Sequence, residues 1–103
     1  MNSERLKMLE QFAAEDPTDP FNQYALALEL TKSDKLKAKE ILDQLMLSNP
    51  GYVPAYYQTA LLYFELMLHG EAKKIIENGI TQATAHRDLK AANELRSLLD
   101  EID

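Results

Sequence analysis

Apolar residues recur along most of the chain at the spacing of one face of an α-helix. After Gly70, small and apolar residues follow the i, i+3, i+4, i+7 pattern of an amphipathic helix. The apolar, tyrosine-rich run from Ala55 to Leu68 precedes it, and together they predict a helix–turn–helix pair. No segment alternates with a period of two, so we expect no β-sheet. The residues that carry the pattern after Gly70 are Ala72, Ile75, Ile76, Gly79, Ile80 and Ala83.

Prolines and capping residues divide the chain into six expected helices. Pro17 ends the first helix, because the residue before a proline avoids the helical region. Asp19 caps the second helix and Pro20 lies in its first turn. Ser33 or Asp34 caps the third helix. The expected helices span residues 3–15, 20–32, 35–48, 53–68, 71–85 and 88–103.

The two central helix pairs repeat each other. Ala38 and Leu42 recur one period later as Ala72 and Ile76. A spacing one residue shorter relates further pairs of positions: Phe21 and Pro54, Tyr24 and Tyr57, Leu28 and Leu61, Leu9 and Leu42, and Phe12 and Leu45. A period of about 34 residues with two helices per unit indicates a helical repeat array, in which each unit buries its apolar face against its neighbours.

This period predicts a single domain, residues 1–103, with four parts. Residues 1–17 form a helix without a partner, 18–52 and 53–86 form two repeats, and 87–103 form a closing helix. The closing helix has one polar face, as the end of an array requires. Its apolar face is expected to consist of Leu89, Ala92, Leu95, Leu98, Leu99 and Ile102.

The repeated residues resemble tetratricopeptide repeats of the small bacterial type. The second repeat matches this family through Tyr56, Ala60, Tyr63, Ala72, Ile76 and Gly79. The first repeat matches through Leu26, Ala27, Ala38, Leu42 and Pro50, and the first helix through Leu9, Phe12 and Pro17. The resemblance implies an all-α fold of six helices, in which antiparallel helix–turn–helix repeats stack as a short right-handed α-solenoid.

Some positions depart from the family pattern. Thr59 replaces the usual leucine, Gln23 replaces the usual aromatic residue, and Leu45 occupies a site that is normally small. Neither repeat has the usual Gly-Asp turn between its helices. Gly79 does match the small site, although glycine inside a helix costs about 1 kcal/mol relative to alanine. We therefore expect a neighbouring helix to approach Gly79 closely.

The resemblance implies a non-catalytic scaffold that binds a partner protein or peptide in the concave groove formed by the first helix of each repeat. Lys32 and Glu65 lie at the margin of this groove. Tyrosine suits a recognition surface because it combines apolar area with a polar tip. The residues carried over as partner-binding are Phe21, Tyr24, Leu28, Thr31, Tyr57, Gln58, Leu61 and Phe64.

Two other interpretations of these apolar residues stay open. They are core residues packed against the first and last helices, or they are buried in a homodimer, which would make the chain a self-assembling structural subunit. The family's clamp for a C-terminal carboxylate is not expected. That clamp needs Lys and Asn where Tyr24, Leu28, Tyr57 and Leu61 stand.

Charge and composition narrow the range of partners and locations. The net charge is −6 and the pI about 4.8, which argues against a nucleic-acid or anionic-membrane partner. The absence of cysteine excludes disulfides and suits a reducing compartment, so we expect a cytoplasmic protein. The sequence reaches a charged residue at Glu4 and has no apolar run that could span a bilayer. A signal peptide and a transmembrane segment are therefore not expected.

No group of residues predicts an enzyme, a cofactor or a metal ion. His69 is placed in a turn and His86 near a helix end, and neither has a second ligand at metal-binding spacing. Both are therefore interpreted as surface residues. The carboxylates lie beside lysines on helix faces, whereas acid–base chemistry needs a pair set apart in an apolar pocket.

Two further sets of residues receive structural interpretations. Four lysines cluster at the turn within the first repeat, and they form either a basic partner site or a solvated helix face. They are Lys32, Lys35, Lys37 and Lys39. The solvated face is favoured because Asp34 and Glu40 interrupt the cluster. Met8, Met46 and Met67 stand at apolar positions, so we expect them to fill the core.

Overall fold

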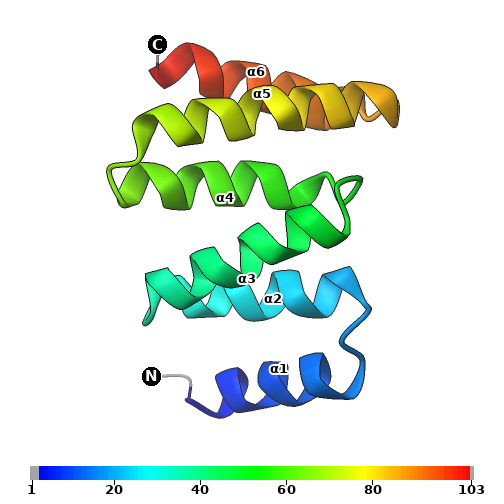
Figure 1. Cartoon of the computed structure of the whole chain (residues 1–103), viewed down its shortest axis with the longest axis vertical. Coiled ribbons are helices and arrows are strands. Elements are labelled where there is room, and N and C mark those ends of the chain that lie inside the picture. Colours follow the sequence, from blue (N-terminus) through cyan, green and yellow to red (C-terminus); the bar gives the residue numbers. More distant parts are fainter. Residues whose placement is uncertain (1–2, 103) are drawn as a thin grey trace. The chain divides into compact units, whose positions relative to one another are not determined.

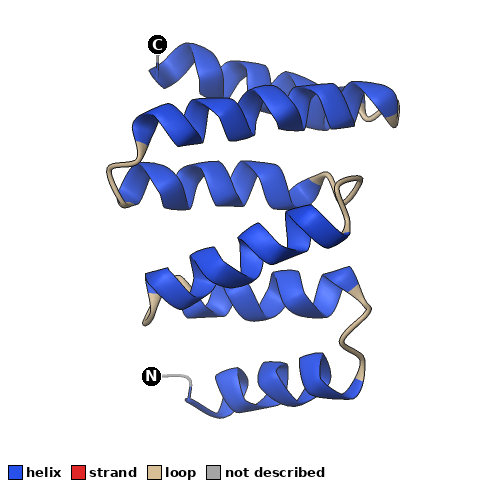
Figure 2. Ribbon diagram, viewed as in Figure 1, coloured by secondary structure: helices blue, strands red, loops and turns tan. Residues whose placement is uncertain are grey.

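The structure, a computed structural model, describes residues 3–102, and every regular element within this range is a helix (Figures 1 and 2). These helices are α1 Ser3–Glu15, α2 Pro20–Leu30, α3 Lys35–Ser48, α4 Pro54–Glu65, α5 His69–Ala85 and α6 Leu89–Ile102. They form two compact units: the N-terminal unit ends at Asn49 and the C-terminal unit begins at Pro50. The predicted termini at residues 1, 2 and 103 lie outside the described residues, and the predicted repeats at 18–52 and 53–86 stay predictions.

Aspartates cap three of the helices at their N-termini. A carboxylate that accepts a hydrogen bond from a backbone N–H of the first turn satisfies a donor that has no partner within the helix. Asp34, and not Ser33, is the residue that caps α3. The three bonds join Phe21 N to Asp19 Oδ1 at 3.0 Å, Lys37 N to Asp34 Oδ1 at 3.1 Å, and Ala91 N to Asp88 Oδ1 at 3.1 Å.

The predicted C-terminal ends of two helices are wrong by two to three residues. The expected helix to residue 32 ends at Leu30, and the expected helix to residue 68 ends at Glu65. Met67 has a left-handed φ of 64°, and the N–H of Leu68 donates to the carbonyl of Tyr63 at 2.8 Å. These features turn the chain so that α5 starts earlier than expected. The apolar pattern continues through this turn, so it did not mark the end of α4.

The turn between α5 and α6 closes in the same way. Arg87 has a left-handed φ of 58°, and the N–H of Asp88 donates to the carbonyl of Ala83 at 2.8 Å. This is the helix-ending motif in which glycine usually takes the left-handed position. Here an arginine takes it, as Met67 does in the preceding turn.

In the N-terminal unit, α2 packs against both α1 and α3. Its buried residues include Leu26, Ala27 and Leu30, and the buried residues of α3 are Ala38, Leu42 and Leu45. Two apolar side chains of α1 are only partly covered. Met8 is 52% exposed and Phe12 46% exposed, so the prediction that Met8 fills the core is wrong. The contact of α1 with α2 thus leaves much of both side chains uncovered.

A buried carboxylate links α1 to α2. Glu29 is only 9% exposed and accepts from Arg5 Nε at 3.0 Å and from Lys32 Nζ at 3.4 Å. A carboxylate removed from water needs such partners to offset its lost hydration. Arg5 therefore fixes the N-terminal part of α1 against the C-terminal part of α2.

In the C-terminal unit, α5 lies between α4 and α6 and packs against both (Figure 1). Ile76 and Ala72 of α5 are fully buried, as the sequence pattern requires. Val53, Ala83 and Ala92 form a cluster of buried residues where the loop before α4 meets α5 and α6. The largest buried side chains of the unit are Tyr56, Leu62, Ile76, Leu95 and Thr59.

Two predicted core residues of this unit are exposed. Met67 is 75% exposed because it lies in the turn after α4, and Leu89 is 67% exposed at the first position of α6. The departure at Thr59 is accommodated without an unpaired hydroxyl. Thr59 is fully buried, and its Oγ1 donates to the carbonyl of Ala55 at 2.7 Å.

Side chains of two neighbouring helices lie close to Gly79 in α5. A Cβ at this position would lie 2.7 Å from Cβ of Tyr56 in α4 and 3.0 Å from Cδ1 of Leu95 in α6. The first distance leaves no room for a methyl group, and the second requires the end of the Leu95 side chain to shift. The expectation that a neighbouring helix approaches Gly79 is confirmed, and two helices do so.

The two repeats fill corresponding positions with side chains of opposite size. In the repeat alignment, Tyr56 corresponds to Gln23 and Gly79 corresponds to Leu45. The second repeat pairs a large residue of the first helix with a residue that has no side chain. The first repeat pairs the shorter Gln23 with Leu45.

Tyr56 gives the C-terminal unit a stability that falls at high pH. Its hydroxyl donates to the carbonyl of Pro50 at 2.6 Å, and burial raises the pKa of the phenol above its ordinary value of 10.0. In the unfolded chain the phenol of Tyr56 loses its proton near pH 10, whereas in the folded chain it keeps the proton to a higher pH. The contribution of Tyr56 is therefore complete below pH 10 and declines as the pH rises beyond it.

We expect Tyr56→Phe to lower the free energy of unfolding at pH 8 by about 1 kcal/mol, because the hydrogen bond is lost. Urea unfolding at pH 8, 10 and 11 should show the gap between the native chain and the variant narrowing above pH 10. A gap that stays constant over this range would mean that the phenol of Tyr56 ionises equally in both states.

Candidate functional site

The residues predicted to bind a partner on α2 lie on the partly exposed side of that helix. Phe21 is 60% exposed, and Tyr24, Leu28 and Thr31 are half-buried. The hydroxyl of Thr31 donates to the carbonyl of Leu28 at 2.6 Å, so it closes its own helix end. Tyr24 and Leu28 are therefore less buried than Leu26 and Ala27 on the same helix.

The four predicted residues of α4 have the same character. Tyr57, Gln58, Leu61 and Phe64 are all half-buried, while Tyr56, Ala60 and Tyr63 on the same helix are buried. The ring of Phe64 lies against the ring of His69, with 5.3 Å between the ring centres. His69 is the first residue of α5 and not a turn residue, which corrects its predicted position.

A hollow of about 280 Å³ lies between α1 and α2, and we call it the α1–α2 hollow. Three of the four predicted residues on α2 line it, namely Phe21, Tyr24 and Leu28. Arg5, Glu29 and Lys32 line it as well, together with Ala25. The hollow thus combines an apolar wall with the ion pairs of Glu29.

Sequence reasoning placed Lys32 at the margin and did not find Arg5 or Glu29. The repeat period does not relate residues of α1 to residues of α2. The position of Arg5 opposite Glu29 could therefore not be predicted from it. A charged residue on an otherwise apolar helix was the available signal, since a buried carboxylate needs a cation nearby.

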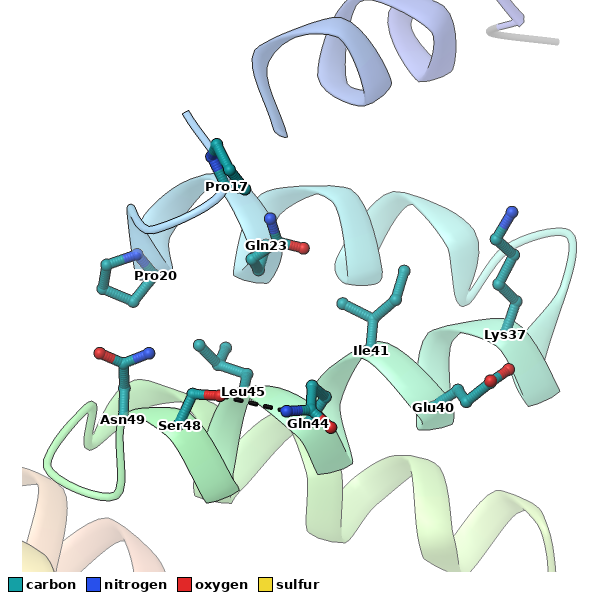
Figure 3. A pocket seen from close by; sticks show the side chains of 10 residues that line it. All are labelled: Pro17, Pro20, Gln23, Lys37, Glu40, Ile41, Gln44, Leu45, Ser48 and Asn49. Atoms are coloured by element: carbon teal, nitrogen blue, oxygen red, sulfur yellow. Dashed lines mark hydrogen bonds between the residues drawn. The ribbon is translucent and has the colours of Figure 1, made fainter. Parts of the chain in front are cut away.

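A second and larger hollow, of about 460 Å³, lies between α2 and α3 (Figure 3). Ile41 and Leu45 of α3 point toward Gln23 of α2 in this view. Lys37 and Glu40 lie at the end nearer the turn between the two helices. The full lining consists of Pro17, Pro20, Gln23, Lys37, Glu40, Ile41, Gln44, Leu45, Ser48 and Asn49.

The sequence did carry a signal for this second hollow. Gln23 stands where the family has an aromatic residue, and the corresponding Tyr56 of α4 is almost fully buried. A shorter side chain at this position leaves the space between α2 and α3 partly unfilled. The lining offers amide and hydroxyl groups, of which Gln44 Nε2 donates to Ser48 Oγ at 3.2 Å, over an apolar floor.

The remaining candidate residues do not form a reactive site. His86 is exposed, and its Nδ1 lies 2.9 Å from the carbonyl of Gln82 in its own helix. Lys39 of the basic cluster pairs with Asp43 at 3.0 Å, one turn further along α3. Across residues 3–102, no three His, Asp or Glu side chains converge where they would hold a metal ion. None of the helices in the described part of the chain is both long and apolar enough to cross a bilayer.

A solved structure shares these repeated helix pairs. A tetratricopeptide repeat domain protein from Salinibacter ruber, known from solution NMR, is 32% identical to this chain, and the match covers 85% of this chain and 90% of that one with a TM-score of 0.82. The chain belongs to the tetratricopeptide repeat family. The predicted family and the all-α fold of repeated helix pairs are therefore confirmed.

MamA, known from a crystal structure, is a second tetratricopeptide-like neighbour. It is 21% identical over 94% of this chain and 64% of its own, with a TM-score of 0.68, and so shows the fold alone. No family model and no curated protein matches the sequence. Tetratricopeptide folds generally mediate interactions between proteins.

Proposed function

We propose that this chain is a non-catalytic interaction module that binds a partner protein or peptide through the apolar, tyrosine-rich sides of α2 and α4. One observation carries the proposal. On both helices, apolar side chains next to buried ones remain half-buried or exposed, as Tyr57 does beside Tyr56 and Leu28 beside Ala27. Burial of this area by a partner would be favourable at about 25 cal/mol per Å².

The residue types support recognition by another protein. Tyrosine and phenylalanine bury large areas while losing few rotatable bonds, and aromatic residues are enriched among those that dominate binding energies. Tyr24 and Phe21 supply this on α2, and Tyr57 and Phe64 supply it on α4. An apolar segment of a partner, helical or extended, is the occupant that such a surface fits.

We expect the double variant Tyr57→Ala/Phe64→Ala to bind its partners at least ten times more weakly than the native chain, because two aromatic anchors are removed. Affinity capture followed by quantitative mass spectrometry measures this. Leu47→Ala is the matched control, since Leu47 is an apolar residue that is 78% exposed on α3. Circular dichroism must show that both variants are folded. Partners captured equally by the double variant and the native chain would contradict the proposal.

Self-assembly is the alternative use of the same side chains. Light scattering on the purified chain distinguishes it from partner binding. A monomer at high micromolar concentration eliminates the homodimer, whereas a dimer that Tyr24→Asp dissociates would place this surface between two copies.

A further inference from the structure

The α1–α2 hollow differs from the rest of the apolar surface by its charge. It lies between an apolar wall of Phe21, Tyr24 and Leu28 and a polar end formed by Arg5, Glu29 and Lys32. Its volume of about 280 Å³ is below that of most small-molecule sites, and suits one or two side chains of a partner. The occupant is therefore better described as part of a peptide than as a free metabolite.

The polar end of the hollow has an excess of positive charge. Glu29 is 9% exposed and lies under the two cations, whereas the side chains of Arg5 and Lys32 are 60% and 69% exposed. Two cations paired with one carboxylate leave one positive charge at this end. The guanidinium of Arg5 reaches Glu29 through Nε, and its terminal N–H groups are those suited to a second, bidentate carboxylate.

The charge at this end of the hollow is opposite in sign to that of the chain. Arg5 and Lys32 exceed Glu29 by one positive charge, on a chain whose net charge is −6. A partner segment that is acidic would be repelled by most of the molecule but attracted to this end of α2. Charge complementarity therefore selects among the apolar segments that the hollow could accept.

We propose that the α1–α2 hollow binds a partner segment in which an apolar side chain lies next to an aspartate or glutamate. The apolar side chain packs against Phe21, Tyr24 and Leu28, and the carboxylate accepts hydrogen bonds from Arg5 and Lys32. Glu29 holds both cations in place and does not touch the partner. This assignment rests on the proposed function and names the chemistry that its α2 surface recognises.

The test uses the full chain and a phage-displayed library of short random peptides. Enriched peptides should carry Asp or Glu beside an apolar residue. The most enriched peptide is then synthesised with a fluorescent label, together with a form in which Asp or Glu becomes Asn or Gln. By fluorescence anisotropy the amide form should bind the native chain about ten times more weakly, as expected for loss of a charge-assisted hydrogen bond.

Charge-neutral variants of the chain complete the comparison. Arg5→Gln/Lys32→Gln should bind the acidic and amide peptides with equal affinity. Lys32→Gln alone should lower the affinity for the acidic peptide about threefold. Because this variant keeps the ion pair of Arg5 with Glu29, such a loss would not be an effect of misfolding. Lys74→Gln/Lys90→Gln removes two exposed lysines from the C-terminal unit and should leave the preference for the acidic peptide unchanged.

The outcomes separate this inference from the function on which it rests. Peptides that lose affinity with Tyr24→Ala but show no acidic preference overturn the inference and leave the proposed function standing. An equal loss with the Lys74→Gln/Lys90→Gln control also overturns it, because the effect would then be one of net charge. Enriched peptides that are insensitive to both Tyr24→Ala and Tyr57→Ala/Phe64→Ala would overturn both.

Discussion

Replacing Gly79 by leucine is expected to lower the free energy of unfolding by about 3 kcal/mol, one of the largest single effects in this chain. The new Cβ alone would lie 2.7 Å from Cβ of Tyr56 and 3.0 Å from Cδ1 of Leu95, before the rest of the side chain is added. Because Cβ of Tyr56 is attached directly to the backbone of α4, the contact is relieved only if a helix moves. Urea unfolding followed by circular dichroism measures the loss.

Gly70→Leu is the matched control for this change. Gly70 lies in the same helix, and a Cβ there would meet no atom within 4 Å. The control should be neutral or slightly stabilising, since leucine is a better helix former than glycine. A loss of similar size in both variants would show that the close approach of α4 and α6 to Gly79 is not the cause.

The first repeat suggests a partial rescue of the leucine variant. Leu45 occupies the site equivalent to Gly79, opposite the shorter Gln23. Tyr56→Gln keeps Cβ but removes the ring, which leaves room for the part of the leucine beyond its own Cβ. In a double-mutant cycle, Tyr56→Gln combined with Gly79→Leu should therefore destabilise less than the sum of the two single changes, with a favourable coupling of about 1 kcal/mol. Strict additivity would contradict the exchange of size between the two repeats.

Ile76→Ala should destabilise the chain by about 3 kcal/mol, through lost burial and the cavity that remains. Ile76 is fully buried in α5, the helix that packs against both α4 and α6. The neighbouring Ile75 is half-buried, so Ile75→Ala should lose clearly less, about 1 kcal/mol. The pair tests the repeat pattern directly, since both residues belong to the predicted apolar face. Equal losses in urea unfolding would mean that burial does not separate the two positions.

The sequence predicted those parts of the fold that follow from periodic burial. The spacing of Ala72 and Ile76 predicted the buried face of α5, and the match of Gly79 to the family's small site predicted the close approach of a neighbouring helix. The choice of Tyr57 and Leu61 as surface residues of α4 came from the resemblance to the family. Both are half-buried, whereas Tyr56 and Ala60, offset from them by one position, are buried.

Features that depend on single backbone angles or on one pair of charges were not predictable in this way. The end of α4 is set by the left-handed conformation of Met67, a residue that shows no preference for such a turn. The α1–α2 hollow depends on Arg5 lying opposite Glu29, which the repeat pattern does not relate. Phe12 is 46% exposed although α1 contacts α2, so apolar character alone does not determine burial.

The two left-handed residues after α4 and α5 have a practical consequence for protein engineering. An L-residue in this conformation is disfavoured by about 1 kcal/mol relative to glycine, which adopts it freely. Met67 and Arg87 are both exposed. The N–H of Met67 donates to the carbonyl of Phe64, one of the residues assigned to recognition, whereas Arg87 lies in the turn after α5. Glycine at these two turns should therefore make the scaffold more resistant to heat. At Arg87 this change alters no residue of the proposed binding surface.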